Sequence, residues 1–219
     1  HRGDEAGLSV IIPFPEKDFS WKQISQSFIR NYFIPICQGD LILEVCKNGT
    51  SVTVDKDSIM HVTDRLGWTV EPPGALSKTS RACMNAMIGL AKNWVDGIEA
   101  VHLEPMGEGQ PFWYPDLIPE SMFDDVRTRL QSGEPVELRI EVPVFRMEGG
   151  RKARYPQKSE IIILLKREDS LGQSDTVWIR RYLSVPKSSH KMKPGYIGIV
   201  LALDGAMEEM LRQSEEVAH

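Results

Sequence analysis

The run Ile161-Ile162-Ile163-Leu164-Leu165 decides the fold that the sequence predicts. Successive side chains of an extended segment point to opposite faces, so five apolar residues in a row make both faces apolar. A strand of this kind belongs in the middle of a sheet that is covered above and below. We therefore expect a central strand here, with the other elements arranged around it.

Further strands are predicted on both sides of this run. Apolar residues occupy every second position from Val136 to Val144, which is typical of a strand with one buried and one wet face. The residues assigned to the wet face are Glu137, Arg139 and Glu141. Pro143 places that end of the strand at an edge or a bulge. Two more strands are predicted over 177–185 and 196–203, after which Asp204 can cap a last helix through Met207, Met210 and Leu211.

The N-terminal half is predicted to contain helices and a hairpin. Apolar residues at helical spacing predict helices over about 20–37 and 78–95, the second with Cys83, Met87, Leu90, Ala91 and Trp94 on one face. Between them, Asn48-Gly49 favours a tight turn joining strands at 41–46 and 51–54. The region around 65–76 is predicted to be a loop, and 98–103 a strand. A helix over about 119–131 would bury Met122, Val126 and Leu130 and stop near Gly133.

These elements predict an α+β (mixed α/β) fold, with a βαββαβ-like N-terminal half and a strand-rich C-terminal half. Residues 1–7 are interpreted as a tag remnant or an artificial boundary, because the chain starts without Met and its first residues are polar. An N-terminal α/β subdomain is assigned to 8–104, a connecting loop to 105–118 and a C-terminal strand-rich α/β subdomain to 119–219. The strand at 8–13 is expected to have its partners outside this chain.

The composition is that of an ordinary globular protein, with 41% hydrophobic and 26% charged residues in 219. No apolar run approaches the roughly 18 residues that cross a bilayer, so no membrane contact and a cytoplasmic location are expected. The three cysteines, Cys37, Cys46 and Cys83, fit neither a zinc pattern nor a redox motif and are interpreted as reduced core thiols.

Positive charge is concentrated between Arg146 and Lys193. This stretch holds twelve Lys and Arg against five Asp and Glu, a balance of +7 in a chain of net charge −5, which leaves −12 for the rest. Such segregation favours an anionic partner, and nucleic acid is one hypothesis. Its candidate contacts are Arg151, Lys152, Arg154, Lys158 and Lys193, with Tyr155 and Trp178 as the nearby aromatics that could stack on bases. The alternative is a set of solvated hairpin loops.

Motifs of complete catalytic sites are missing. The sequence has no Gly-x-x-x-x-Gly-Lys-Ser/Thr, Gly-x-Gly-x-x-Gly or His-Glu-x-x-His, and no cofactor or metal is expected in this chain. A small hydrolase site could be assembled from His102 with Glu99, Glu104 and Glu108, but a solvated strand end explains these residues more simply. Ser184, Ser188 and Ser189 lie near His190 in sequence, which does not make a triad.

Three segments carry a resemblance to a known family. They are Gly7-Leu8-Ser9-Val10-Ile11-Ile12-Pro13-Phe14-Pro15, Trp21-x-x-Ile24 with Asn31-Tyr32-Phe33-x-x-Ile36-x-x-Gly39-x-Leu41, and the stretch 177–218, ending Glu216-Val217-Ala218-His219. They resemble the region that follows the ATPase domain in certain prokaryotic GHKL-type proteins, a family that includes gyrase B, MutL, histidine kinases and the large heat-shock chaperone.

The resemblance implies a transducer-like middle or C-terminal region that lacks the ATP-binding domain itself. Residues 8–13 would then be the last strand of an upstream ATPase domain, with ATP and Mg bound by the parent protein. A transducer region of this family offers a basic residue to the γ-phosphate, for which Lys187, Lys191 and then Lys78 are nominated by position. Asp204-Gly205-Ala206 lacks the second Gly of the family's Asp-x-Gly-x-Gly, so this chain alone is expected not to be an enzyme. The expected partners are the upstream ATPase domain, with nucleic acid and a homodimer as further options.

Overall fold

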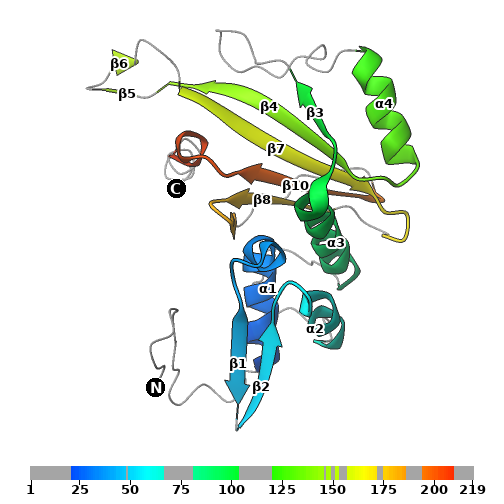
Figure 1. The fold of residues 1–219 in the computed structure, drawn as a ribbon, viewed down its shortest axis with the longest axis vertical. Helices are drawn as coiled ribbons and strands as arrows, with labels where there is room; N and C mark the ends of the chain where they lie inside the picture. The colour runs from blue at the N-terminus through cyan, green and yellow to red at the C-terminus, as the bar shows by residue number, and fades with distance from the viewer. Residues whose placement is uncertain are drawn as a thin grey trace.

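A computed structural model of the chain describes residues 21–47, 49–66, 81–103, 120–145, 147–148, 151–152, 157–171, 175–185 and 194–209 (Figure 1). The elements in chain order are α1 (Trp21–Gln38), β1 (Leu43–Lys47), β2 (Thr50–Val54), α2 (Ile59–Arg65), α3 (Arg81–Gly97), β3 (Ala100–Leu103), α4 (Glu120–Gln131), β4 (Val136–Val144), β5 (Met147–Glu148), β6 (Arg151–Lys152), β7 (Gln157–Arg167), β8 (Asp175–Arg180), β9 (Leu183–Ser184) and β10 (Tyr196–Ala202). A short helical segment, 205–209, follows β10. The predicted α+β class is confirmed.

The main sheet has the strand order β3-β4-β7-β10-β8-β9. β3 and β4 are parallel and are joined through α4, so they form a βαβ unit, while β4 and β7 form a long antiparallel hairpin. β10 lies between β7 and β8, antiparallel to the first and parallel to the second. The run Ile161–Leu165 is therefore in an interior strand, as predicted.

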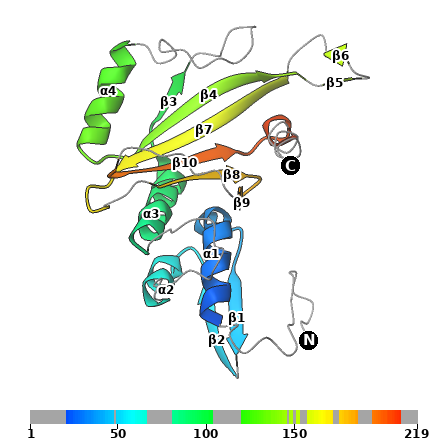
Figure 2. The same ribbon diagram turned by 180° about the vertical axis from the view of Figure 1, so that it is seen from behind.

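Helices cover both faces of this sheet (Figures 1 and 2). On β7, Ile162 and Leu164 belong to an apolar cluster that includes buried residues of α1 and α3. Their neighbours Ile161 and Ile163 pack against a second cluster, which contains Val126 of α4 and the apolar side of β4. The alternation of side chains along a strand thus divides the interior into two layers.

The larger cluster joins the two halves of the sequence. It contains Ile29 and Phe33 of α1, both fully buried, together with Ile197 and Ile199 of β10. In addition, β3 from the first half pairs with β4 from the second. The segment 105–118, assigned above to a connecting loop, lies outside the described residues.

The N-terminal helix and hairpin agree with the sequence patterns. α3 buries the apolar face predicted for it, and β1 pairs antiparallel with β2. α1 is a helix as predicted, but of the face expected from Trp21, Ile24, Phe28, Tyr32 and Phe33 only Phe33 is buried, and the buried side is centred on Ile29, Phe33 and Ile36. Gly49 has φ +78, the left-handed conformation that the Asn-Gly signal predicts for the turn. Ser20, Lys78 and the predicted strand at 8–13 lie outside the described residues.

The helix α2 was not predicted. It is only seven residues long and begins at an Asp55 turn, where one carboxylate oxygen accepts hydrogen bonds from the Ser58 amide at 2.8 Å and the Ser58 hydroxyl at 2.7 Å. These bonds lower the pKa of Asp55. A seven-residue helix offers too few turns for its period to stand out in the sequence.

Three other expectations need correction. The segment predicted as one strand, 177–185, is two antiparallel strands, β8 and β9, joined by a turn at Arg181 and Tyr182. In α4, Val126 is buried and Leu130 partly buried as predicted, but Met122 is 39% exposed because it lies in the first turn, away from the sheet. Cys37 and Cys83 are buried and form no disulfide, whereas Cys46 is exposed on β1.

The polar face of β4 is not uniformly wet. Glu137 is only 2% exposed, and its carboxylate accepts a hydrogen bond from Nε of Arg139 at 2.6 Å. Arg139 therefore compensates the buried negative charge of Glu137, and it also lies 3.3 Å from Glu160 on β7. The prediction that Pro143 lies at an edge is confirmed. β3 pairs only with residues 137–140 of β4, so the end of β4 that contains Pro143 is an edge of the described sheet.

Candidate functional site

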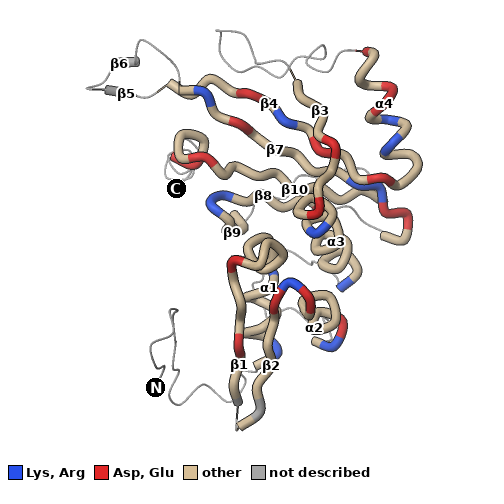
Figure 3. The backbone as a smooth tube through the Cα atoms, in the orientation of Figure 1, with Lys and Arg blue, Asp and Glu red and all other residues tan. Residues whose placement is uncertain are grey.

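The basic stretch 146–193 is the candidate site, and the structure shows how its charges are compensated. Four described basic side chains in it each lie within ion-pair distance of a carboxylate. The pairs are Lys158–Glu141 at 2.9 Å, Lys166–Glu168 at 3.3 Å, Arg167–Asp169 at 2.7 Å and Arg181–Glu208 at 3.3 Å. Figure 3 shows blue and red segments interleaved along β4 and β7. Lys158, a predicted nucleic-acid contact, is exposed and forms an ion pair with Glu141.

Most of the other basic residues of the stretch lie in segments that the structure does not describe. Arg146, Arg154, Lys187, Lys191 and Lys193 all lie outside the described residues, as does Lys78. Arg151 and Lys152 form the strand β6, which pairs with β5 beyond the end of the β4–β7 hairpin. The structure gives their backbone position only.

The two basic connections belong to opposite ends of the sheet. The one with Arg151 and Lys152 precedes Gln157, the first residue of β7. The one with Lys187 and Lys191 rejoins the sheet at Gly195, whose carbonyl accepts a hydrogen bond from the Glu168 amide at 2.7 Å, just after the last residue of β7. The eleven residues of β7 separate these points by about 33 Å at roughly 3.3 Å per residue. The predicted contacts thus divide into two groups.

The strand that precedes residues 186–193 packs against α1. This strand is β9, and the Ser184 hydroxyl donates a hydrogen bond to Oδ1 of Asn31 at 2.5 Å. The Val185 amide bonds the Trp178 carbonyl at 2.8 Å and closes the β8–β9 pair. Ser184 is thus engaged with α1, while Ser188, Ser189 and His190 lie outside the described residues.

An exposed aromatic residue in this region was missed by the sequence analysis. Tyr182 is 37% exposed in the turn between β8 and β9, whereas Trp178 is partly buried within the sheet and Tyr155 lies outside the described residues. The turn has no Gly or Asn, so the usual sequence signal of a two-residue hairpin turn is missing.

Of the four residues in the hydrolase hypothesis, the structure describes two, His102 and Glu99. His102 lies on β3 opposite Arg139 of β4, and its side chain is exposed. Glu99 is also exposed, and Glu104 and Glu108 lie outside the described residues. Within the described ranges, no group of three or more His, Cys, Asp or Glu side chains could hold a metal ion.

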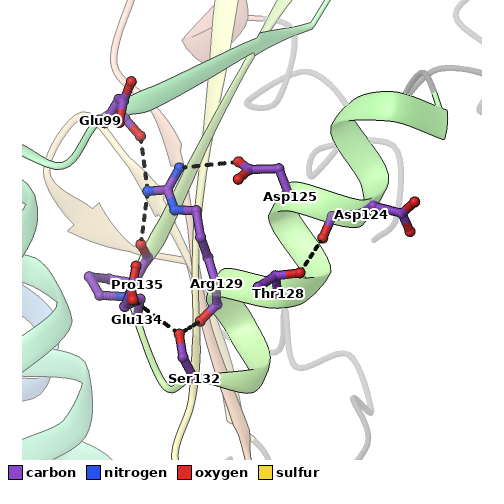
Figure 4. A network of polar contacts seen from close by, with 8 residues as sticks. All are labelled: Glu99, Asp124, Asp125, Thr128, Arg129, Ser132, Glu134 and Pro135. Atoms are coloured by element: carbon purple, nitrogen blue, oxygen red, sulfur yellow. Dashed lines mark hydrogen bonds and ion pairs between the residues drawn. The ribbon is translucent and has the colours of Figure 1, made fainter.

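Arg129 organises a polar network next to Glu99 (Figure 4). Its guanidinium donates to the Glu99 carbonyl and to the Pro135 carbonyl, both at 3.3 Å, and lies 3.9 Å from the Asp125 carboxylate. These carbonyls immediately precede β3 and β4, so Arg129 holds the starts of the two parallel strands together. The partners are mainly backbone carbonyls, which indicates a structural role.

Asp204 is a tether between β7 and the segment after β10. Its carboxylate accepts hydrogen bonds from the amides of Ala206 and Met207, as an N-cap does, and from the Ser159 hydroxyl and the Glu160 amide. Burial alone would raise the pKa of Asp204, but these four bonds outweigh it and lower the pKa below its usual value. The predicted cap is confirmed, and the Asp204-Gly205-Ala206 segment serves the fold.

One buried titratable group is the thiol of Cys37. Burial raises the pKa of the Cys37 thiol to about 12, so this cysteine remains protonated at neutral pH.

No helix in the described part of the chain is long and apolar enough to span a membrane.

Comparison with models of protein families, with curated proteins and with solved structures found no match. The function is therefore inferred from the geometry described above together with the sequence patterns.

The hydrogen bonds of Asp204 predict a pH-dependent stability. Because the pKa of the folded state lies below the ordinary 3.8, the stabilisation is complete above that pH and is lost as the pH falls through the folded pKa. Asp204→Ala should lower the free energy of unfolding by about 0.5–2 kcal/mol at pH 7, the usual cost of losing an N-cap. Asp204→Asn keeps an acceptor but has no titratable charge.

Urea unfolding at pH 7 and pH 3 tests this expectation. The stability difference between wild type and Asp204→Asn should be smaller at pH 3 than at pH 7, because below pH 3.8 the unfolded carboxyl is protonated and part of the stabilisation by the folded carboxylate is lost. An equal difference at the two pH values would show that the carboxylate charge contributes nothing.

Proposed function

We propose that this chain is a non-catalytic transducer or partner-coupling region of a larger GHKL-like ATPase. The observation that carries the proposal is the packing of α1 on β9, the strand that leads into the connection with Lys187 and Lys191. In this interpretation α1 transmits the movement of an upstream domain to the sheet and to the basic connection.

The dimensions of α1 suit such a role. Its 18 residues span about 27 Å at 1.5 Å per residue. The C-terminal half is the part fixed in the core, where Ile29, Phe33 and Ile36 are fully buried in the cluster that also contains β10. A close-packed interior shifts as a body when pushed, because its side chains leave little free volume. A displacement of α1 would therefore reach β9 through Asn31 and Ser184.

The proposed ATPase domain would be joined to α1 through the residues that precede Trp21. The eight steps from Pro13 to Trp21 can span at most about 28 Å when extended. This length lets the domain lie near the sheet without a further linker. ATP and Mg would be bound by that domain, and Lys187 or Lys191, then Lys78, would approach the γ-phosphate from this chain.

The lysines can be tested in a protein that joins this chain to its ATPase domain. Lys187→Ala or Lys191→Ala should lower kcat for ATP hydrolysis about tenfold to a hundredfold, the effect of removing a charged hydrogen bond to phosphate. Lys158→Ala is the matched control, because Lys158 is exposed and already paired with Glu141; its activity should stay within about twofold of wild type.

Two results would contradict the proposal. One is a coding sequence upstream of residue 1 that contains no ATP-binding domain. The other is unchanged ATP hydrolysis in both lysine variants and in Ser184→Ala, which removes the hydrogen bond between β9 and α1.

A second candidate function is nucleic-acid binding. It is favoured by the distribution of charge, since residues 176–203 contain five Lys or Arg and no Asp or Glu. The described acidic residues near this stretch are partly engaged in the ion pairs given above. A nucleic-acid strand bound along residues 176–203 would meet no Asp or Glu of that segment that could repel its phosphates.

Reversing charge tests the second function directly. The variant with Arg151, Lys152, Lys187 and Lys191 all replaced by Glu should weaken DNA or RNA binding more than tenfold at 50 mM salt and reduce its salt dependence. The control reverses Lys22 and Lys56, two exposed lysines outside the basic stretch. The absence of binding by the wild-type chain at low salt would reject this function.

A further inference from the structure

The helix α1 contains a proline, Pro35, in its last turn. Proline has no amide hydrogen, so the helical hydrogen bond from residue 35 to the Asn31 carbonyl cannot form, and the proline ring pushes against that carbonyl. Helices bend at such positions, because the turn before the proline has lost part of its support. The turn between Asn31 and Pro35 is therefore the point at which α1 bends most easily.

The part of α1 that follows this turn is held firmly. The Pro35 carbonyl accepts hydrogen bonds from the amides of Asp40 at 3.0 Å and Leu41 at 3.2 Å, which close the C-terminal end of the helix. All residues of the range 33–37 are buried. Because a close-packed interior leaves little free volume, this end of α1 is fixed in the core.

The part of α1 that precedes the turn is held less firmly. Within residues 21–32, Ser25 and Ile29 are fully buried, and the others are half-buried or exposed. The Ser25 hydroxyl donates to the Trp21 carbonyl at 2.9 Å, a bond that competes with the helical hydrogen bonds and favours bending. This part of the helix can therefore change its direction at a lower cost than the last turn.

The residue at the bend is also the one that contacts the edge strand. Asn31, whose carbonyl has no amide donor at Pro35, accepts a hydrogen bond at Oδ1 from the Ser184 hydroxyl of β9 at 2.5 Å. Its Nδ2 donates to the Ser27 carbonyl, one turn earlier, at 2.7 Å. One side chain thus connects the bend, the N-terminal part of α1 and β9.

The lengths of α1 convert a large movement at its start into a small movement at β9. At roughly 1.5 Å per residue, Asn31 lies about 6 Å from Pro35, and Trp21 lies about 21 Å from it. A swing of about 20°, the size of a proline kink, would move Asn31 by about 2 Å and Trp21 by about 7 Å. The smaller displacement is enough to break the bond to Ser184, since bonds of this type extend to only about 3 Å.

We propose that α1 is hinged between Asn31 and Pro35, and that the Ser184–Asn31 hydrogen bond is a latch that holds the hinge closed against β9. A bond from Gln26 to the Leu66 carbonyl, at 3.2 Å, holds the same part of α1 at the end of α2 and would stretch when the hinge opens. The hinge goes beyond the proposed function, because it is a property of this chain and requires no ATPase domain.

Double electron–electron resonance, which measures the distribution of distances between two spin labels, tests the hinge. One label is placed at Lys158→Cys on β7. The other is placed either at Lys22→Cys, near the start of α1, or at Asp40→Cys, just after its last turn; all three side chains are exposed. Cys46→Ser removes the exposed native thiol, while the other two cysteines are buried.

Removing the latch should free the N-terminal part of α1 alone. Ser184→Ala should widen the distance distribution of the Lys22 label by up to about 7 Å and leave that of the Asp40 label unchanged. Ser184→Thr keeps the hydroxyl and should behave as wild type. The double variant Pro35→Ala with Ser184→Ala should return the Lys22 distribution to the wild-type width, since alanine restores the hydrogen bond to the Asn31 carbonyl.

Three results would overturn the proposal. An unchanged Lys22 distribution in Ser184→Ala would show that the bond is no latch. An equally wide distribution in the double variant would show that the movement does not depend on the proline. Widening of both the Lys22 and the Asp40 distributions would mean that the core has loosened as a whole. None of these results bears on ATP hydrolysis by the lysine variants, which tests the proposed function separately.

Discussion

Ile163 and Leu164 are neighbours on β7, yet their side chains enter apolar clusters on opposite sides of the sheet. The two layers of the core meet at this strand. One layer places α1 and α3 against β7 and β10, and the other places α4 against β4. Since burial of one such side chain contributes about 1.5–3 kcal/mol, the interior of β7 supplies a large share of the energy that orders both layers.

The position of β10 follows from the same constraint. β7 needs a partner on each side, and β10 supplies the second one while it also pairs with β8. Consequently β8 and β9 lie at the edge of the described sheet, where β9 contacts α1. The chain leaves this edge at Val185, which bonds Trp178, and returns to the sheet at Gly195. The strand that precedes residues 186–193, β9, is therefore the one that α1 contacts. This is the physical basis for regarding α1 as the coupling element.

The sequence was informative wherever one local pattern decides the structure. The apolar run in β7, the helical spacing in α1 and α3, and Asn48-Gly49 in the hairpin all have a local physical cause, and their predictions are confirmed. Burial of Glu137 could not be predicted in this way. It depends on the ion pair with Arg139, whose second partner, Glu160, is a residue of another strand that only the β4–β7 register brings near.

The candidate site was less predictable than the fold. Charge counting identified the basic stretch, but it could not show that Lys158 is paired with Glu141 or that the basic connections belong to opposite ends of the sheet. The turn at Tyr182 was missed because its backbone conformation conflicts with its residue types. The roles proposed for Lys187, Lys191 and Lys78 stay predictions, since these residues lie outside the described part of the chain.

The central claim is that α1 and the sheet belong to one cooperative core, so that α1 can move the strand it contacts. Native-state hydrogen exchange measures this directly, by comparing amides of α1, such as Ile29 and Phe33, with amides of β10, such as Ile199 and Leu201. A shared core predicts that both sets open with the same free energy and lose protection at the same denaturant concentration. If the α1 amides open at a distinctly lower free energy while β10 stays protected, α1 is an independent unit and the account is contradicted.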